Sequence, residues 1–408
     1  MVMTTLLLMT ALTAGPFDAS QARFDDVVRN LRNPDPDARM EALKTLREAQ
    51  HLEAITPIAL LVNDPLDVIQ LEAIAAELSF YLVESVHARK RIAFLIETRS
   101  GGGGAQSAFD SGPLAVWPRP VPPELVASLL KAVDDEHGKV RLEAIYALGT
   151  IARAPLAADA ESQLIKALDH YDPDVRAAAA RVVGRLRVKS AGDALIKAVN
   201  DSRQPVRYAA MRALGDIKEE KAIAALTQQF EFYRKNEGGW SALDGLAKIA
   251  HASSVPLFKA RLVDKDPYLR RASAEGLARA GDASAIPALE AGAGNDSSDM
   301  VRAAMAFALQ MLGKDYVPRL AAFLKSEKLM TQVSDYFLEL GPGVATELVA
   351  HLKDPDEAIR GNAALVLGAI GSQAHVAALQ AVGSDRDRDV ARAATRAIER
   401  IKMRSVGL

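Results

Sequence analysis

Apolar and small residues recur along the chain in a frame of ten positions that opens with an apolar residue followed by Arg. Val140–Gly149 shows this frame, and Val175–Gly184 and Val206–Gly215 repeat it. Apolar residues three and four positions apart within each copy fall on one face of a helix. Each copy therefore predicts an amphipathic helix with one buried face.

The arginine at the second position of the frame gives the period of the repeat. Successive copies are spaced by about 31 residues, and two gaps of nearly twice that length indicate degenerate units aligned on Leu246 and Leu340. Further copies lie at Arg39–Leu46, at Gln70–Ile74 and in a last unit that runs to Ile398. The anchoring arginines of the clear copies are Arg141, Arg176, Arg207, Arg270, Arg302 and Arg360. We therefore expect about ten units.

This period fits a hairpin of two helices of roughly 10–14 residues joined by short turns. Asp-Pro dipeptides are expected to start several second helices, because Asp caps the free N–H groups and Pro suits the first helical position. The dipeptides are Asp35-Pro36, Asp64-Pro65, Asp172-Pro173, Asp266-Pro267 and Asp354-Pro355. The predicted fold is an all-α, right-handed α-solenoid of helical hairpins, more than about 60% helical and without a sheet.

The run Asp-Pro-Asp-Val-Arg at 172–176 and the Ala-rich frame ending in Leu-Gly resemble the bacterial HEAT-like repeats, also called PBS-lyase-type repeats. The resemblance extends from about Phe24 to Lys402. It implies a solenoid whose second helices line the concave side. It says little about function, because members include scaffolds, chromophore lyases and DNA-repair proteins.

The ends and the one interruption of the array suggest four segments. Residues 1–22 read as a signal peptide, since Met3–Ala14 is uncharged and mostly apolar and small residues follow at Ser20–Ala22. N-terminal HEAT-like repeats are expected over 23–99, a Gly- and Pro-rich loop over 100–123 and the main array over 124–408. Export to the periplasm or secretion is expected; the alternative is a cytoplasmic protein whose first residues form a capping helix.

The segment 100–123 is rich in Gly and Pro, which favours a flexible loop followed by an extended stretch. An additional amphipathic helix is predicted before it, at about Val83–Glu97. The segment is interpreted either as a tolerated surface insertion or as a mobile arm over the binding surface, with Trp117 as its anchor.

Composition and short motifs argue against several kinds of binding and catalytic site. The net charge of −2 provides no general attraction for nucleic acid, and the absence of Cys excludes thiolate nucleophiles and disulfides. None of the seven His residues precedes Glu, as the iron-binding HEAT-repeat hydroxylases would require, and no His-x-x-x-His pair or phosphate-binding loop occurs. The sequence therefore predicts neither an enzyme nor a metal or cofactor site. It predicts a monomer without a membrane span.

Charged residues recur with the repeat. Asp172 and Arg176, or Asp266 and Arg270, are four apart and suit a local ion pair. Each Arg is also expected to reach the Asp of the next repeat, forming a ladder along the stack. Because these pairs recur in nearly every repeat, both the local pair and the ladder are interpreted as stabilising the fold, and the residues are not site candidates.

The candidate site comes from positions that differ between repeats. The first and fifth residues after each anchoring position share one face of the second helix, and in the central repeats they are Tyr, Trp, Arg and acidic residues, of which Tyr, Trp and Arg are enriched in binding hot spots. The candidates are Tyr146, Arg181, Tyr208, Arg212, Trp240, Asp244, Arg271 and Glu275. They predict a non-catalytic scaffold that binds an unidentified protein or peptide.

Two alternatives follow from the resemblance. A lyase- or chaperone-like protein would hold a linear tetrapyrrole and its acceptor protein, with Asp244 or Glu275 facing the pyrrole nitrogens. A DNA-binding protein would need a continuous basic strip, and the same two acidic residues interrupt the arginine series.

The first testable prediction concerns residues 1–22. If they are a signal peptide, the mature chain begins near Arg23. N-terminal sequencing of natively expressed protein measures this directly, and a retained Met1 or Val2 would show that the segment is structural.

Overall fold

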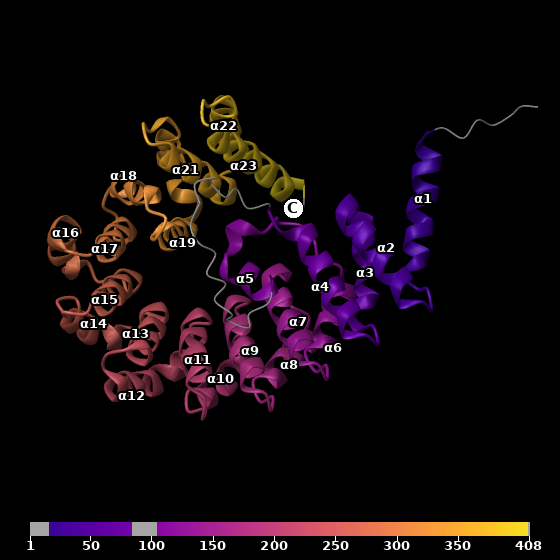
Figure 1. Cartoon of the computed structure of the whole chain (residues 1–408). Coiled ribbons are helices and arrows are strands. Elements are labelled where there is room, and N and C mark those ends of the chain that lie inside the picture. The colour runs from indigo at the N-terminus through magenta and orange to yellow at the C-terminus, as the bar shows by residue number, and fades with distance from the viewer. Residues whose placement is uncertain (1–15, 84–103, 407–408) are drawn as a thin grey trace, which may run out of the picture. The chain divides into compact units, whose positions relative to one another are not determined.

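The computed structural model describes residues 16–83 and 104–406, and these are almost entirely helical (Figure 1). The described residues are 77% helical, and they contain no strand beyond one isolated bridge between Leu82 and Val116. The prediction of an all-α chain is therefore confirmed. The predicted helix at Val83–Glu97 and residues 1–15 lie outside the described residues. Helix α1 passes through the expected cleavage site at Ser20–Ala22.

The chain divides into two compact units, residues 1–80 and 81–408. The first contains α1 (Pro16–Asn30), α2 (Pro36–Ala49), α3 (Ile55–Ala59) and nearly all of α4 (Asp67–Tyr81). Its core includes the fully buried Leu43, Ile58 and Ile74. The boundary falls within α4, earlier than the predicted end of the N-terminal repeats at residue 99.

The second unit begins with a short helix, α5 (Gly104–Asp110), and continues as nine helical hairpins over the described residues. The first helices are α6 (Pro123–Ala132), α8 (Ala158–Ala167), α10 (Gly192–Ala198), α12 (Ile223–Tyr233), α14 (Val255–Arg261), α16 (Ile286–Asn295), α18 (Val317–Ala321), α20 (Ala345–Leu348) and α22 (Val376–Val382). The second helices are α7 (Gly138–Ile151), α9 (Pro173–Arg185), α11 (Gln204–Asp216), α13 (Glu237–Ile249), α15 (Pro267–Arg279), α17 (Asp299–Met311), α19 (Met330–Leu340), α21 (Glu357–Ile370) and α23 (Arg388–Val406).

Successive second helices pack closely because the frame ends in Gly. A Cβ atom added to Gly215 would lie 2.8 Å from Cα of Gly245, and one added to Gly368 would lie 2.7 Å from Cα of Ala397. Larger side chains at these positions would separate the helices. The repeated Leu-Gly ending therefore sets the spacing of the array.

The predicted helix starts are correct in part. Asp35, Asp172 and Asp266 cap α2, α9 and α15, with Pro at the first helical position. The prediction is wrong for Asp64-Pro65 and Asp354-Pro355. There the helices begin at Asp67 and Glu357, because the chain turns once more after Pro, and Asp356 caps α21.

The prediction of a loop throughout 100–123 is also corrected. Gly104–Asp110 is helical and a single 3₁₀ turn follows at Pro113–Ala115. The amide of Trp117 donates to the carbonyl of Tyr81 over 2.7 Å, and Arg153 donates to the carbonyl of Trp117. The described part of this segment is thus tied to the array rather than being a free arm.

The same segment contacts the last helix. Arg400 on α23 donates hydrogen bonds to the carbonyl oxygens of Pro113, Leu114 and Val116 over 2.6–3.1 Å. Burial, together with the charges of Arg404 and Arg153, lowers the pKa of Arg400 to about 10. Hydrogen bonds from one arginine therefore connect the segment before α6 with the C-terminal helix, although almost all the repeats lie between them in the sequence.

In five of the repeats, the arginine of the frame forms an ion pair with an Asp of the next repeat rather than a local pair. Arg176 donates through Nε and Nη2 to both carboxylate oxygens of Asp201, over 2.8 and 3.1 Å. Its Nη1 donates to the carbonyls of His170 and Tyr171, in the turn before its own helix. Equivalent ladder pairs are Arg39–Asp64, Arg141–Asp172, Arg270–Asp296 and Arg360–Asp385.

Each ladder aspartate also caps the turn in which it lies. Asp201 accepts from the amide of Arg203, and Asp296 accepts from the amide of Ser298. Although burial raises the pKa of Asp296, the hydrogen bonds and charge of Arg270 and the Ser298 amide lower it below the ordinary value. Neighbouring turns are thus joined by a carboxylate that stays charged in the folded protein.

The ladder gives the second testable prediction. Arg270→Met should lower the free energy of unfolding at neutral pH by about 2–4 kcal/mol, because it leaves Asp296 and two carbonyls buried without their donor. Since the pKa of Asp296 is lowered by folding, this contribution is present above about pH 4 and is lost as the pH falls further. Urea unfolding at pH 7 and pH 3 measures both effects.

Arg302→Met is the matched control. Arg302 holds the same frame position and donates to one turn carbonyl, that of Asp296, but its ion pair is with the exposed Asp299 on its own helix. We expect a loss below about 1 kcal/mol. Equal losses in the two variants would contradict a stabilising role for the ladder.

Candidate functional site

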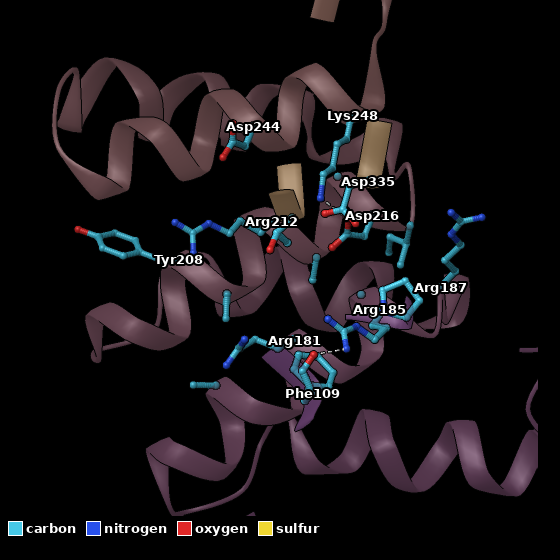
Figure 2. A pocket seen from close by; sticks show the side chains of 18 of the residues that line it. Phe109, Arg181, Arg185, Arg187, Tyr208, Arg212, Asp216, Asp244, Lys248 and Asp335 are labelled. Carbon is cyan, nitrogen blue, oxygen red and sulfur yellow. Dashed lines mark hydrogen bonds and ion pairs between the residues drawn. The ribbon is translucent and has the colours of Figure 1, made fainter. Parts of the chain in front are cut away.

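The second unit contains a large pocket bordered by its second helices. Its volume is about 1740 Å³, and residues of α7, α9, α11, α13, α15 and α19 line it, together with α5. Figure 2 shows the wall formed by α9, α11 and α13, where the side chains of Arg181, Tyr208, Arg212 and Lys248 project toward the pocket.

At one end of the pocket, α5 packs on α7 and α9 through an aromatic and cationic cluster. Arg181 donates from Nη1 to the hydroxyl of Tyr146 over 3.2 Å and forms an ion pair with Asp110. Its guanidinium also lies 5.0 Å from the ring centre of Phe109. Arg185 donates to the Phe109 carbonyl over 2.5 Å. Burial raises the pKa of Tyr146, against the opposing charge of Arg181.

The middle of the wall carries Tyr208 and Arg212 on α11. Tyr208 contacts Tyr233 edge to face, at 5.7 Å between ring centres, and accepts a hydrogen bond from Gln204. Arg212 is exposed and lies 3.4 Å from Glu237, a long contact that leaves its guanidinium open to a ligand.

A buried polar network closes the opposite end. Arg271 on α15 donates to Asp244 over 2.5 Å and to Glu275 over 2.8 Å. The Tyr336 hydroxyl of α19 donates to Glu275 over 2.5 Å, and Arg279 donates to its other oxygen over 3.1 Å. Although burial by itself raises the pKa of Glu275, the charges of Arg271 and Arg279 and the hydrogen bonds lower it to about 2.

The same network brings α19 onto α15. Arg279 and Glu339 form a two-bond ion pair, with Nε to Oε1 at 2.7 Å and Nη2 to Oε2 at 2.8 Å. The ring of Tyr336 stacks on Phe307 at 4.3 Å between centres. The degenerate repeat at 330–340 thus contributes a wall of the pocket.

Trp240 lies in a smaller adjoining pocket of about 270 Å³ that shares Arg212, Asp244 and Arg271 with the large one. Its ring stacks on Tyr268 at 4.1 Å, and its Nε1 donates to Asp266 over 2.8 Å. The side chain of Trp240 is half-buried.

The structure brings the predicted residues together but does not expose them equally. Seven of the eight candidates line the large pocket, and Trp240 lies beside it. A residue that binds a partner must be accessible to it, but Tyr146, Tyr208 and Glu275 are only 4–6% exposed. The reason is that α5, Tyr233 and α19 cover them.

Several lining residues were not predicted from the sequence. Phe109 lies in the segment expected to be a loop, and Asp335, Tyr336 and Glu339 lie in the degenerate unit aligned on Leu340, outside the candidate set. The sequence did contain a signal for these last three residues, the run of aromatic and acidic side chains at 335–339. Such a run has no structural role on an exposed helix face, so it could have indicated contacts with another helix.

Figure 2 also shows a group of opposite charges at the wall, where Lys248 reaches toward Asp335 and Asp216. Lys248 forms an ion pair with Asp216. Burial, opposed by the charges of Lys248 and Arg185, raises the pKa of Asp335. No group of three metal-ligating side chains occurs among the residues that the structure describes.

The hairpin array and its lined pocket define a helical-repeat protein of the solenoid class. A model of HEAT repeats matches residues 161–231, 239–310 and 342–406, which is half of the chain. The chain therefore belongs to the HEAT repeat family. No helix in the described ranges is long and apolar enough to cross a membrane.

The chain is also similar to several solved structures. An engineered protein is 19% identical over 93% of this chain and 98% of its own, with a TM-score of 0.41. The CpcE–CpcF complex of phycocyanin lyase from Nostoc sp. PCC7120 is 24% identical over 62% and 96%, with a TM-score of 0.36. Human deoxyhypusine hydroxylase with glycerol is 18% identical over 73% and 98%, with a TM-score of 0.29. None of the curated proteins compared with the chain matches it.

The network at Glu275 generates the third testable prediction. Glu275→Gln should lower the free energy of unfolding at neutral pH by about 3 kcal/mol, because it leaves Arg271 and Arg279 without their shared carboxylate. The pKa of Glu275 falls on folding, so the difference from wild type should be complete above about pH 4.5 and should shrink as the pH falls toward 2. Denaturant unfolding across this range measures it.

Glu237→Gln is the control, because it shows whether loss of any carboxylate of the pocket lowers stability in a pH-dependent manner. Glu237 is exposed and makes only the long contact with Arg212. Its loss should change stability by less than about 1 kcal/mol. An effect of Glu275→Gln that does not depend on pH would contradict the stabilisation of the Glu275 carboxylate by Arg271 and Arg279.

Proposed function

We propose that the chain is a non-catalytic scaffold that holds a segment of a partner protein in the pocket of its second unit. The observation that carries this proposal is the size of the pocket, about 1740 Å³. Sites for small molecules usually measure about 300–1,000 Å³ and are mostly apolar. A pocket larger than this range and rich in charged groups suits a stretch of polypeptide.

The side chains around the pocket support binding rather than catalysis. Its described lining includes Tyr, Arg, Lys, Asp and Glu but no Ser, His or Cys. Tyr208 and the half-buried Trp240 offer aromatic surface, and Arg212 offers a guanidinium with a weak internal partner. Aromatic and arginine side chains provide most of the energy in protein interfaces.

The tetrapyrrole alternative is less well supported by the same contacts. It requires Asp244 or Glu275 to accept hydrogen bonds from pyrrole nitrogens. Glu275 already accepts from Arg271, Arg279 and Tyr336, and Asp244 accepts from Arg271. A DNA-binding role is opposed by Asp216 and Asp335 in the middle of the wall. The predicted signal segment favours a partner outside the cytoplasm.

The fourth testable prediction uses the absence of Cys, which makes any introduced Cys the unique attachment point for a photo-crosslinker. Thr331→Cys places it at an exposed pocket position on α19. Phe232→Cys, 77% exposed on the first helix α12, is the control. We expect host proteins to be crosslinked selectively from position 331.

The crosslinks should also depend on the aromatic and cationic residues. Adding Trp240→Ala and Arg212→Ala should reduce crosslinking from position 331 about tenfold or more, because hot-spot truncations cost about 2 kcal/mol or more of affinity. Equal crosslinking from 331 and 232, or no effect of the added substitutions, would contradict the proposal. A crosslinked linear tetrapyrrole or nucleic acid would favour one of the alternatives.

A further inference from the structure

The charges that line the pocket are unbalanced. Ten Arg and Lys residues border it against seven Asp and Glu residues, although the whole chain carries a net charge of −2. Most of the acidic residues have an internal cation: Asp216 pairs with Lys248, Asp244 and Glu275 with Arg271, and Glu339 with Arg279. The pocket therefore carries an excess of positive charge, which comes from the Arg and Lys residues without an acidic partner in the lining.

Two of these cations occupy backbone positions that favour Gly. Arg187 and Lys218 have φ angles of 53° and 56°, in the left-handed region. Each follows a second helix, α9 or α11, and both side chains are exposed at the pocket with no partner recorded among the described residues. A side chain with a Cβ atom is strained in this conformation, whereas Gly is not.

The same turn in later repeats uses Gly. Arg187 donates its amide to the carbonyl three residues back, and the next amide reaches the carbonyl of Val183 over 3.1 Å. Gly281 and Gly313 make the same pair of bonds after α15 and α17, with φ angles of 70° and 83°. The turn is thus equivalent in these repeats, and two consecutive repeats beside the pocket carry a strained cation instead of Gly.

Strained backbone positions are often kept where a side chain has a functional role. A cation at a helix C-terminus also interacts favourably with the helix dipole. The dipole applies equally to the repeats that carry Gly281 and Gly313, so it does not explain why the cations occur beside the pocket. We propose that Arg187 and Lys218 bind the carboxylates of an acidic segment of the partner protein. This inference rests on the proposed function and names the chemistry of the ligand.

The arrangement of charges favours an acidic polypeptide over nucleic acid. Asp216 and Asp335 lie on the wall close to Lys248, so the positive groups are separated by negative ones (Figure 2). A nucleic acid presents a phosphate at every nucleotide and would bring some of them against these carboxylates. A peptide can place Glu or Asp opposite the cations and uncharged residues opposite the acids.

The fifth testable prediction replaces both strained cations with the residue that the later repeats use. Fluorescence anisotropy would measure binding of a labelled peptide of alternating Glu and Gly to the full chain. Wild type should bind it more tightly than peptides of alternating Gln and Gly or Lys and Gly, and added salt should weaken binding. Arg187→Gly with Lys218→Gly should weaken binding about three- to tenfold, because two exposed ion pairs are lost, while the melting temperature stays the same or rises.

Ala250→Gly is the matched control. Ala250 has a φ angle of 58° after α13 but does not line the pocket. It should raise the melting temperature without changing peptide affinity. Unchanged affinity of the double variant, or no preference of wild type for the Glu peptide, would overturn the inference. A tighter complex with a labelled oligothymidylate that the double variant weakens would assign the cations to nucleic acid instead.

These outcomes are separable from failure of the proposed function. Selective crosslinking of host proteins from position 331 combined with indifference to Glu would leave the scaffold in place and reject only an acidic partner. Absence of selective crosslinking would reject the scaffold itself.

Discussion

The regular repeats depend on an arginine that joins a hairpin to the next one, at five places among the described residues. Its guanidinium ties two carbonyls of the turn before its own helix to a carboxylate in the following turn, as Arg176 does with Asp201. These side chains are only 7–15% exposed. Because a solenoid has few contacts beyond nearest neighbours, a bond that fixes each turn against the next fixes the direction of the second helices. The small residues that follow then set their spacing, and a continuous wall results.

The pocket arises where the array departs from this regular pattern. The degenerate repeat lacks the ladder arginine, and α19 instead places Tyr336 and Glu339 against Glu275 and Arg279 of α15. Burying charged groups is costly unless every one has partners. Glu275 meets this condition with three donors, which indicates a rigid end wall. At the other end, α5 fills the same role with Phe109 and Asp110 around Arg181.

The cations of the second unit therefore form two groups. One group, which includes Arg176, Arg270 and Arg271, donates hydrogen bonds to internal carboxylates and carbonyls and stabilises the fold. The other, represented by Arg187 and Lys218, is exposed at turns whose equivalents after α15 and α17 carry Gly281 and Gly313. The first group has internal partners, whereas the second is exposed to solvent and accessible to an external anion. This division supports a scaffold whose pocket is selective for charge.

The sequence alone determined the fold class, because a repeated frame of Arg, Ala and Leu-Gly has one physical solution: stacked amphipathic hairpins. It also identified seven of the second-helix residues that line the pocket, since positions four apart share a helix face. Tertiary structure decided the rest. Local and inter-repeat pairing of Arg270 were equally consistent with spacing, and only the stack shows that Asp296 is within reach. Tyr146 and Glu275 became buried because α5 and α19 cover them, and these contacts join residues about 40–60 positions apart that no local pattern connects.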